Sequence, residues 1–397
     1  MRRRVLCLSI LCCMVPIAVT ACLWDYDTLK MERAQFPGIA ELISGKFLRH
    51  SSEFYEWRIS DRRKKILENP EDVRLYDDLS VAYDKTGQHE QAIQTILRVQ
   101  AIQPDRYETY ANLGTFHIHS GDLETGKKFI DRAIEINADA HFGREIYQQL
   151  LVEYVLERRG DGPLPQPMST QSARFGPRGF AEFLALRKNF EIGNPQNKDK
   201  IAAAVKGISG MMRFGNHDSP VLLEALADLL MAQNDELFRN LAARAWLKAS
   251  YSVEDQAVRA RYRKAADQVL SLQTDGSNRR NRVSLESVEQ QFRKELADAD
   301  AWFERLRKDE QDWIAAGEDV DLRFSDRYYT DPVLPSEVKS QAQSRRKMTD
   351  RSPIWSVQFW PLYAVLIVIG FVIFRNRSAV LRRIRSGVSP DERTDID

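Results

Sequence analysis

The chain has 397 residues, with little cysteine, glycine or proline and no excess of either charge. All its cysteines lie at the beginning (Cys7, Cys12, Cys13 and Cys22), which excludes a disulfide framework or a cysteine-ligated metal site in the remainder. The 58 basic residues are balanced by 57 acidic ones, so no overall field attracts nucleic acid. Few segments alternate with the period of a strand, and we therefore predict an all-α fold.

The sequence also lacks the motifs of common catalytic sites, such as a nucleophile elbow, paired zinc ligands or a glycine-rich dinucleotide turn. Gly121 to Lys128 nearly matches a phosphate-binding loop, but Lys128 replaces the hydroxyl that binds magnesium and no strand is expected before it. His117 and His119 are two positions apart and point in different directions on a helix, and the other histidines are scattered singly. We predict no enzyme activity, cofactor, metal or small-molecule substrate.

Residues 73–140 contain a pattern that recurs with a period of 34. The first unit has the residues Tyr76, Leu79, Tyr83, Gly87, Ala92, Val99 and Pro104, and the second has Tyr110, Leu113, His117, Gly121, Gly126, Ala133 and Ala138. This period and these residue types resemble the tetratricopeptide repeat, a pair of antiparallel helices. Small residues such as Gly126 are expected where two helices cross closely, and Gly87 and Gly121 where a first helix ends.

The resemblance implies a class of function, which is to hold a protein or peptide partner. In that family the first helix of each pair lines a concave groove, which here predicts groove residues Arg74, Asp77, Asp84, Asn112, Thr115 and His119. Asn112 stands where some family members hold the backbone of a ligand. Asp77 and Val81 replace the Lys and Asn that grip a C-terminal carboxylate in other members, so a carboxylate clamp is not expected. The alternative is that the chain's own helix, such as Leu285–Ala316, fills the groove.

Residues 1–21 have the pattern of a secretory signal. Arg2-Arg3-Arg4 precede an apolar run from Val5 to Ala21. Val19-Thr20-Ala21-Cys22 resembles a bacterial lipobox, which predicts lipidation of Cys22. The alternatives are a chance cysteine near an ordinary cleavage site and an uncleaved membrane helix. In each case the residues that follow are exported.

A second apolar segment lies near the other end, at residues 355–374. It is uncharged, and a helix of this length spans ~30 Å, about the hydrocarbon core of a bilayer. We predict a transmembrane helix of the bacterial inner membrane, with the main domain in the periplasm and residues 375–397 as a cytoplasmic tail. This architecture, with Leu-Trp-Asp-Tyr-Asp after Cys22, resembles repeat-containing bacterial membrane proteins.

Between the two ends the sequence alternates between helical and irregular segments. We expect a helical cap at 22–70, repeats at 71–158, an exposed linker at 159–178, a section of degenerate repeats at 179–273, a long charged helix at 283–316 and an irregular juxtamembrane linker at 317–354. Residues 141–157 are expected to be a cap helix or a degenerate unit.

The leading hypothesis is a non-enzymatic scaffold or adaptor that binds proteins at the bacterial cell envelope. One alternative is an envelope enzyme, or a subunit of one, with its cleft in residues 179–316. Clustered buried carboxylates or histidines in a cleft would favour that alternative, and a dry apolar junction would contradict it. A passive tether without an accessible groove is the third possibility.

Overall fold

The computed structural model describes residues 23–25, 37–169, 171–172, 176–177, 179–271 and 283–329. The predicted signal and Cys22, the apolar segment 355–374 and the tail lie outside these ranges, so those predictions stay open. No helix in the described ranges is both long enough and apolar enough to cross a membrane. The chain divides into two units, Met1–Thr330 and Asp331–Asp397, and all described residues belong to the first.

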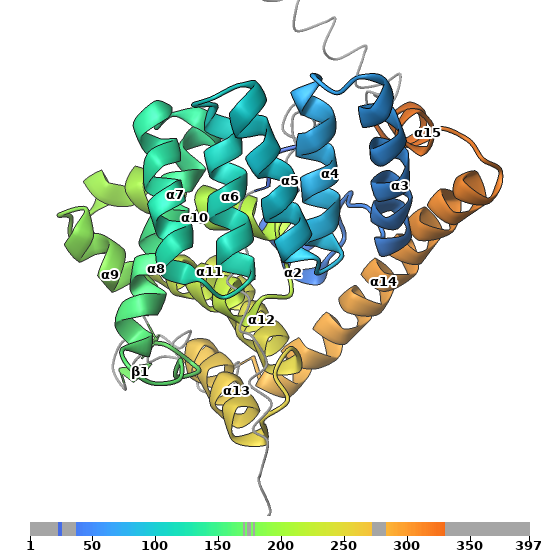
Figure 1. Ribbon diagram of the computed structural model, residues 1–397. Helices are drawn as coiled ribbons and strands as arrows, with labels where there is room; N and C mark the ends of the chain where they lie inside the picture. The colour runs from blue at the N-terminus through green and yellow to red at the C-terminus, as the bar shows by residue number, and fades with distance from the viewer. Residues whose placement is uncertain are drawn as a thin grey trace, which may run out of the picture. The chain divides into compact units, whose positions relative to one another are not determined.

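The described residues are mainly helical, which confirms the predicted all-α fold (Figure 1). The helices are α2 (Ile39–Ser44), α3 (Ser52–Glu68), α4 (Val73–Lys85), α5 (His89–Ile102), α6 (Tyr107–His119), α7 (Leu123–Ile136), η1 (Ala140–Gly143), α8 (Arg144–Arg159), α9 (Gly179–Arg187), η2 (Pro195–Asn197), α10 (Lys198–Phe214), α11 (Pro220–Ala232), α12 (Glu236–Tyr251), α13 (Gln256–Ser271), α14 (Leu285–Ala315) and α15 (Val320–Tyr328). A short antiparallel hairpin, β1 (Gln171–Ser172) and β2 (Gly176–Pro177), lies between α8 and α9.

Helices α4 and α5 form the first predicted repeat, and α6 and α7 form the second. The turns inside the pairs contain Gly87 and Gly121, whose φ angles of 76° and 92° favour glycine. A close approach explains Gly126. A Cβ there would lie 2.6 Å from Ile118 Cγ1 and 2.8 Å from the carbonyl oxygen of Gly114, so only glycine lets α6 and α7 pack at this distance.

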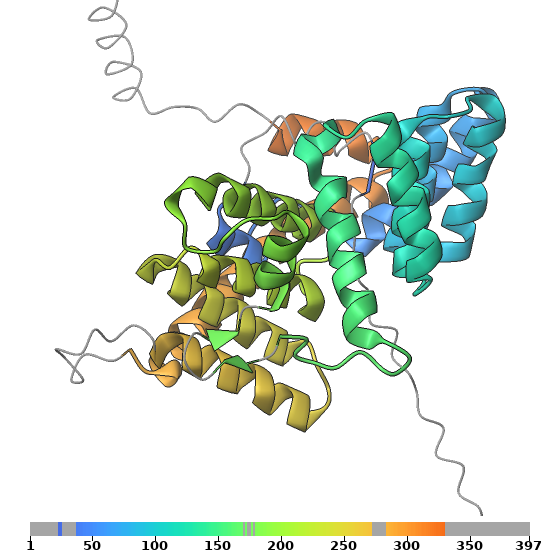
Figure 2. The same ribbon diagram turned by 90° about the vertical axis from the view of Figure 1, so that its left-hand side faces the viewer.

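The helical array continues beyond the repeats. Helix α8 packs against α7 on one side and α10 on the other, and it buries Leu151, Val152 and Val155. Figure 2 shows α8 standing between the repeats and the second helical section, so it joins the two parts and does not cap the first. The largest apolar cluster of the described residues is centred on that second section and extends into α6, α7 and α8. Residues 221–232 of α11 are buried, and Trp246 of α12 is fully buried.

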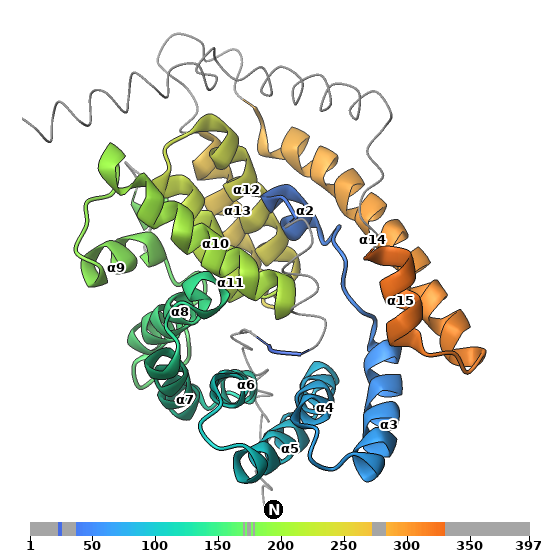
Figure 3. The same ribbon diagram turned by 90° about the horizontal axis from the view of Figure 1, so that it is seen from above.

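The long helix α14 closes the array. It contacts α12 and α13 on one side and α3 on the other, so the helices follow one another round a closed circuit (Figure 3). Near α3, Leu306 and Trp313 of α14 form an apolar cluster with Phe54. Residues 23–25 run inside this circuit (Figure 3), bordered by α3, α4 and α6.

Two segments expected to be irregular are more ordered than the sequence suggested. Met168 and Ser169, in the predicted exposed linker, are buried, because Ser169 binds carboxylates of α11. Within the predicted juxtamembrane linker, residues 320–328 form helix α15. Its N-terminus is capped by Asp319, and Val320 and Phe324, one turn apart, bury their side chains in the cluster around Phe54.

Candidate peptide-binding groove

Residues 23–25 of the same chain lie against the repeats, at the surface that the sequence predicts to be a groove. The side chain of Asn112, on α6, makes two hydrogen bonds with the backbone of Trp24. Its Oδ1 accepts from the Trp24 N–H at 2.8 Å, and its Nδ2 donates to the Trp24 carbonyl oxygen at 3.0 Å. Asn112 is fully buried. A side-chain amide offers one acceptor and donors side by side, so this contact recognises an extended backbone and not a particular side chain.

The side chains next to this backbone contact are bound by apolar surfaces. Leu23 is only 2% exposed and packs in a cluster with Val81 of α4 and Phe116 of α6. The ring of Trp24 meets the ring of Tyr107 edge to face, with the centroids 6.4 Å apart. The segment is therefore held by side-chain burial as well as by Asn112.

The third residue of the segment, Asp25, forms an ion pair with α3. Arg58 Nη1 donates to Asp25 Oδ2 at 3.2 Å, and the guanidinium of Arg58 also binds Asp321 of α15. Arg58 is fully buried, and its guanidinium lies over the ring of Phe54, 4.3 Å from the centroid. One arginine thus joins the start of the described chain to a helix near its end.

The other predicted groove residues have different surroundings. Arg74 is exposed and pairs with Asp72. Asp77 is buried and accepts two hydrogen bonds from Arg106, at 3.2 and 2.9 Å, which ties α4 to the start of α6. Burial raises the pKa of Asp77 to about 7, against the opposing effect of Arg106.

Thr115 is also fully buried, and its Oγ1 accepts a hydrogen bond from Gln148 of α8 at 3.3 Å. Asp84 and His119 lie side by side, and the structure adds His89, which the sequence did not single out. The Nδ1 atoms of His89 and His119 lie 2.8 and 2.7 Å from the two carboxylate oxygens of Asp84. Asp84 and His89 are brought together by the turn at Gly87.

A cavity of about 200 Å³ adjoins the bound segment. It is lined by residues that precede the repeats, by α4 and by the end of α10 with the turn that follows: Leu23, Asp25, Phe47, Arg49, His50, Ser52, Tyr55, Val81, Lys85, Met212, Arg213, Phe214, Gly215 and His217. Lys85 Nζ donates to the carbonyl oxygens of Phe214 and Gly215, at 2.6 and 2.7 Å, and so satisfies the free carbonyls at the end of α10. Burial lowers the pKa of Lys85 to about 8.

The second helical section contains two buried carboxylates, Glu224 and Asp228, one turn apart on α11. The N–H and hydroxyl of Ser169 donate to Glu224 at 2.6 and 2.7 Å, and the N–H of Phe180 donates to Asp228 at 2.8 Å. Burial raises the pKa of both carboxyls. Both side chains are completely inaccessible to solvent, and their hydrogen bonds fasten Ser169 and the start of α9 to α11.

Comparison with known proteins agrees with the repeat geometry. Residues 73–106 and 107–139 each match the family described as Tetratricopeptide repeat. Neither the curated proteins nor the solved structures gave a significant match to the chain. The chain thus contains two tetratricopeptide repeats, formed by α4 with α5 and by α6 with α7.

Proposed function

We propose that this protein is a non-enzymatic scaffold of the bacterial envelope whose repeats bind an extended protein segment by its backbone. The observation that carries the proposal is the pair of hydrogen bonds between Asn112 and Trp24. Tetratricopeptide repeats are interaction modules, and the contact with Trp24 gives an example of what the groove accepts. Membrane attachment at Cys22 and residues 355–374 is part of the proposal and rests on the sequence pattern.

The bound segment has a consequence for the placement of the scaffold. Trp24 follows Cys22 by two residues, and an extended chain reaches at most ~3.5 Å per residue. A lipid-bearing Cys22 would therefore lie within roughly 7 Å of the backbone that Asn112 holds. In this arrangement the repeats sit against the membrane surface, and a partner reaches the groove by displacing residues 23–25.

A binding experiment with the full-length protein in detergent tests the groove. Replacing Leu23 and Asp25 by glycine and Trp24 by proline, which has no N–H for Asn112 to accept, empties the groove, and a fluorescent peptide of residues 23–31 then serves as the ligand. We expect the emptied variant to bind this peptide more tightly than the wild type by at least about tenfold. The wild type's own segment competes at an effective concentration in the millimolar range. A peptide of the same composition in scrambled order is the control.

The role of Asn112 is tested in the same assay. Adding Asn112→Ala to the emptied variant removes two hydrogen bonds, each contributing about 0.5–1.5 kcal/mol, so peptide affinity should fall about tenfold. An emptied variant that does not bind the peptide, or binds it equally well without Asn112, contradicts the proposed groove.

The scaffold function itself requires a partner, which a photo-crosslinker can capture in native membranes. Asp77 and Thr115 are buried and cannot report such a contact, whereas Glu108, at the start of α6, is partly exposed. We expect a crosslinker at Glu108 to capture a protein more efficiently in the emptied variant than in the wild type. Capture that is absent from both, or insensitive to Asn112→Ala, contradicts a scaffold that uses this groove.

A further inference from the structure

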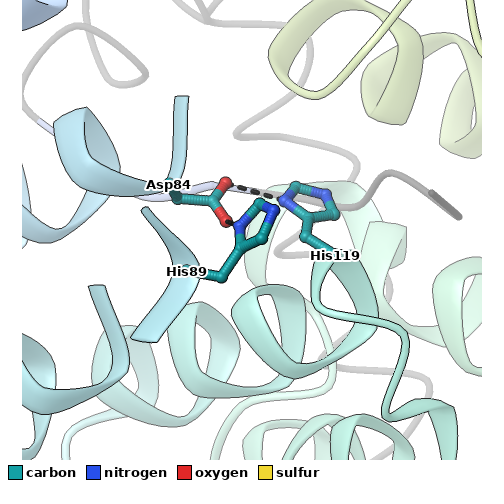
Figure 4. Close-up of side chains that lie close together, drawn as sticks. All are labelled: Asp84, His89 and His119. Atoms are coloured by element: carbon teal, nitrogen blue, oxygen red, sulfur yellow. Dashed lines mark hydrogen bonds and ion pairs between the residues drawn. The ribbon is translucent and has the colours of Figure 1, made fainter. Parts of the chain in front are cut away.

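Asp84, His89 and His119 form a compact cluster at the junction of the two repeats (Figure 4). Each comes from a different helix: Asp84 from the end of α4, His89 from the first residue of α5 and His119 from the last residue of α6. The carboxylate of Asp84 points between the two imidazole rings (Figure 4). One potential ligand atom from each residue lies within 4.8 Å of the others.

We propose that this cluster is a binding site for a divalent transition-metal ion of the zinc, cobalt or nickel type. Two imidazoles and one carboxylate are a donor set that these ions favour. Calcium and magnesium prefer sites made of oxygen ligands, so they are not expected here. None of these three residues makes the described contacts with residues 23–25. The metal site therefore does not depend on the peptide-binding proposal.

The ligand atoms lie within 4.8 Å of one another, so side-chain rotations can bring them to the spacing that such an ion needs. Zinc binds nitrogen and oxygen ligands at ~2.0–2.2 Å, so tetrahedral ligands stand ~3.4 Å apart. The present separations of 2.8 and 2.7 Å between the Nδ1 atoms and the carboxylate oxygens are slightly shorter, as direct hydrogen bonds require. His89 keeps 29% of its side chain exposed, which gives an ion access and leaves room for water to complete the coordination.

The charge of the cluster also favours a cation. The side chain of Asp84 is 1% exposed, and both ion pairs described for it are with histidine. A divalent ion bound by the two imidazoles would compensate this buried carboxylate directly.

Metal binding would connect the two repeats. The ligands lie on α4, α5 and α6, so an ion would fix the first repeat to the first helix of the second. His119 ends the same helix that carries Asn112, which places the ion about two turns along α6 from the residue that holds Trp24.

The test uses full-length protein in detergent, stripped with a chelator and titrated with Zn²⁺ by calorimetry and with Co²⁺ by visible absorption. We expect one Zn²⁺ per chain and a cobalt spectrum without thiolate bands. In His89→Ala, the affinity for Zn²⁺ should fall at least about tenfold. Loss of a residue that only hydrogen-bonds to a metal ligand already lowers metal affinity by that much. This position is partly exposed at a helix start, and circular dichroism verifies that the variant is folded.

His117→Ala is the matched control. His117 is on the same helix as His119 but stacks on Phe129, with the ring centroids 5.3 Å apart, so its removal should leave metal affinity unchanged. Three results would overturn the proposal. These are no stoichiometric binding by the wild type, equal affinity in His89→Ala, and a cobalt spectrum with thiolate bands that His89→Ala does not change. In these cases the cluster is a hydrogen-bonded triad only.

Discussion

The side-chain amide of Asn112 holds the backbone of Trp24 from both sides, accepting its N–H at 2.8 Å and donating to its carbonyl at 3.0 Å. The two residues are 88 positions apart in the chain, and the contact places the start of the described chain inside its own repeats. A groove expected to receive a partner is thus occupied by residues that directly follow the proposed lipid anchor. The occupied groove links the repeat architecture to the proposed lipid anchor of the protein.

Removing the amide should loosen this segment. We expect Asn112→Ala to lower the free energy of unfolding by about 1–2 kcal/mol, because two hydrogen bonds are lost at a buried position. Urea denaturation measures the loss, and faster proteolysis after Trp24 reports release of the segment. Asn137→Ala, at an exposed helix end, is the control and should change stability by less than about 0.5 kcal/mol. Equal effects of both substitutions would contradict the clamp.

Replacing Arg58 by alanine should destabilise the fold more than the same change at an exposed neighbour. Arg58→Ala removes a buried partner of Asp25 and one of the two arginines that bind Asp321, the other being Arg62, and removal of one member of a buried pair typically costs about 3–5 kcal/mol. Denaturant titration measures this cost. Arg63→Ala, on the same helix but exposed, should stay within about 0.5 kcal/mol of the wild type. If Arg58→Ala lowers the free energy of unfolding no more than Arg63→Ala does, the pairing of Arg58 does not stabilise the fold.

The close contact between α6 and α7 should make the fold sensitive to one added methyl group. Gly126→Ala adds a methyl group that would meet Ile118 at 2.6 Å, and such overpacking typically costs about 1–3 kcal/mol. The thermal midpoint should fall accordingly. Gly162→Ala is the control, since the nearest atom to a Cβ there, the carbonyl oxygen of Arg159, is 3.8 Å away. Tolerance of Gly126→Ala would mean that the helices are farther apart than described.

Acid should weaken the junction between α14 and the second helical section. Hydrogen bonds from Arg263, and then from Tyr251 and Arg293, lower the pKa of Glu289 from 4.5 to about 2. A carboxyl whose pKa is lowered by folding stabilises the folded state at pH values above its ordinary pKa. This contribution is lost as the pH falls from 4.5 toward 2. The free energy of unfolding is measured between about pH 6 and about pH 2, the range in which this carboxyl gains its proton. It should decrease less on acidification in Glu289→Gln than in the wild type.

The exposed Glu286, near the start of the same helix, provides the control for this acid titration. Glu286→Gln should reproduce the pH dependence of the wild type. If Glu289→Gln also reproduces it, Glu289 does not make the described ion pairs in solution.

The repeats could be predicted from the sequence because they are encoded locally. The recurrence over 34 positions and the glycines at 87, 121 and 126 report turns and close helix packing within one pair. Asn112 could be selected from its place in the repeat. The segment that it binds could not, because residues 23–25 are too few to show periodicity and their contacts are distant in sequence.

The histidine cluster and α15 were missed for related reasons. His89 approaches Asp84 only through the turn between helices, and His119 approaches it only when the second repeat packs on the first, 35 positions later. In α15, the polar residues around Val320 and Phe324 concealed a pair with one-turn spacing that is buried against α3 and α14.

The most direct test of the central claim, that residues 23–25 occupy the groove, is a photo-crosslink from position 24. Benzoylphenylalanine in place of Trp24, irradiated in native membranes, should react within the same chain with a peptide from Tyr107–His119, since the Trp24 ring lies against Tyr107. Mass spectrometry of the digested protein identifies the linked peptides. An intramolecular link to α6 is the predicted result. Links to other proteins alone, with none to α6, would contradict the account.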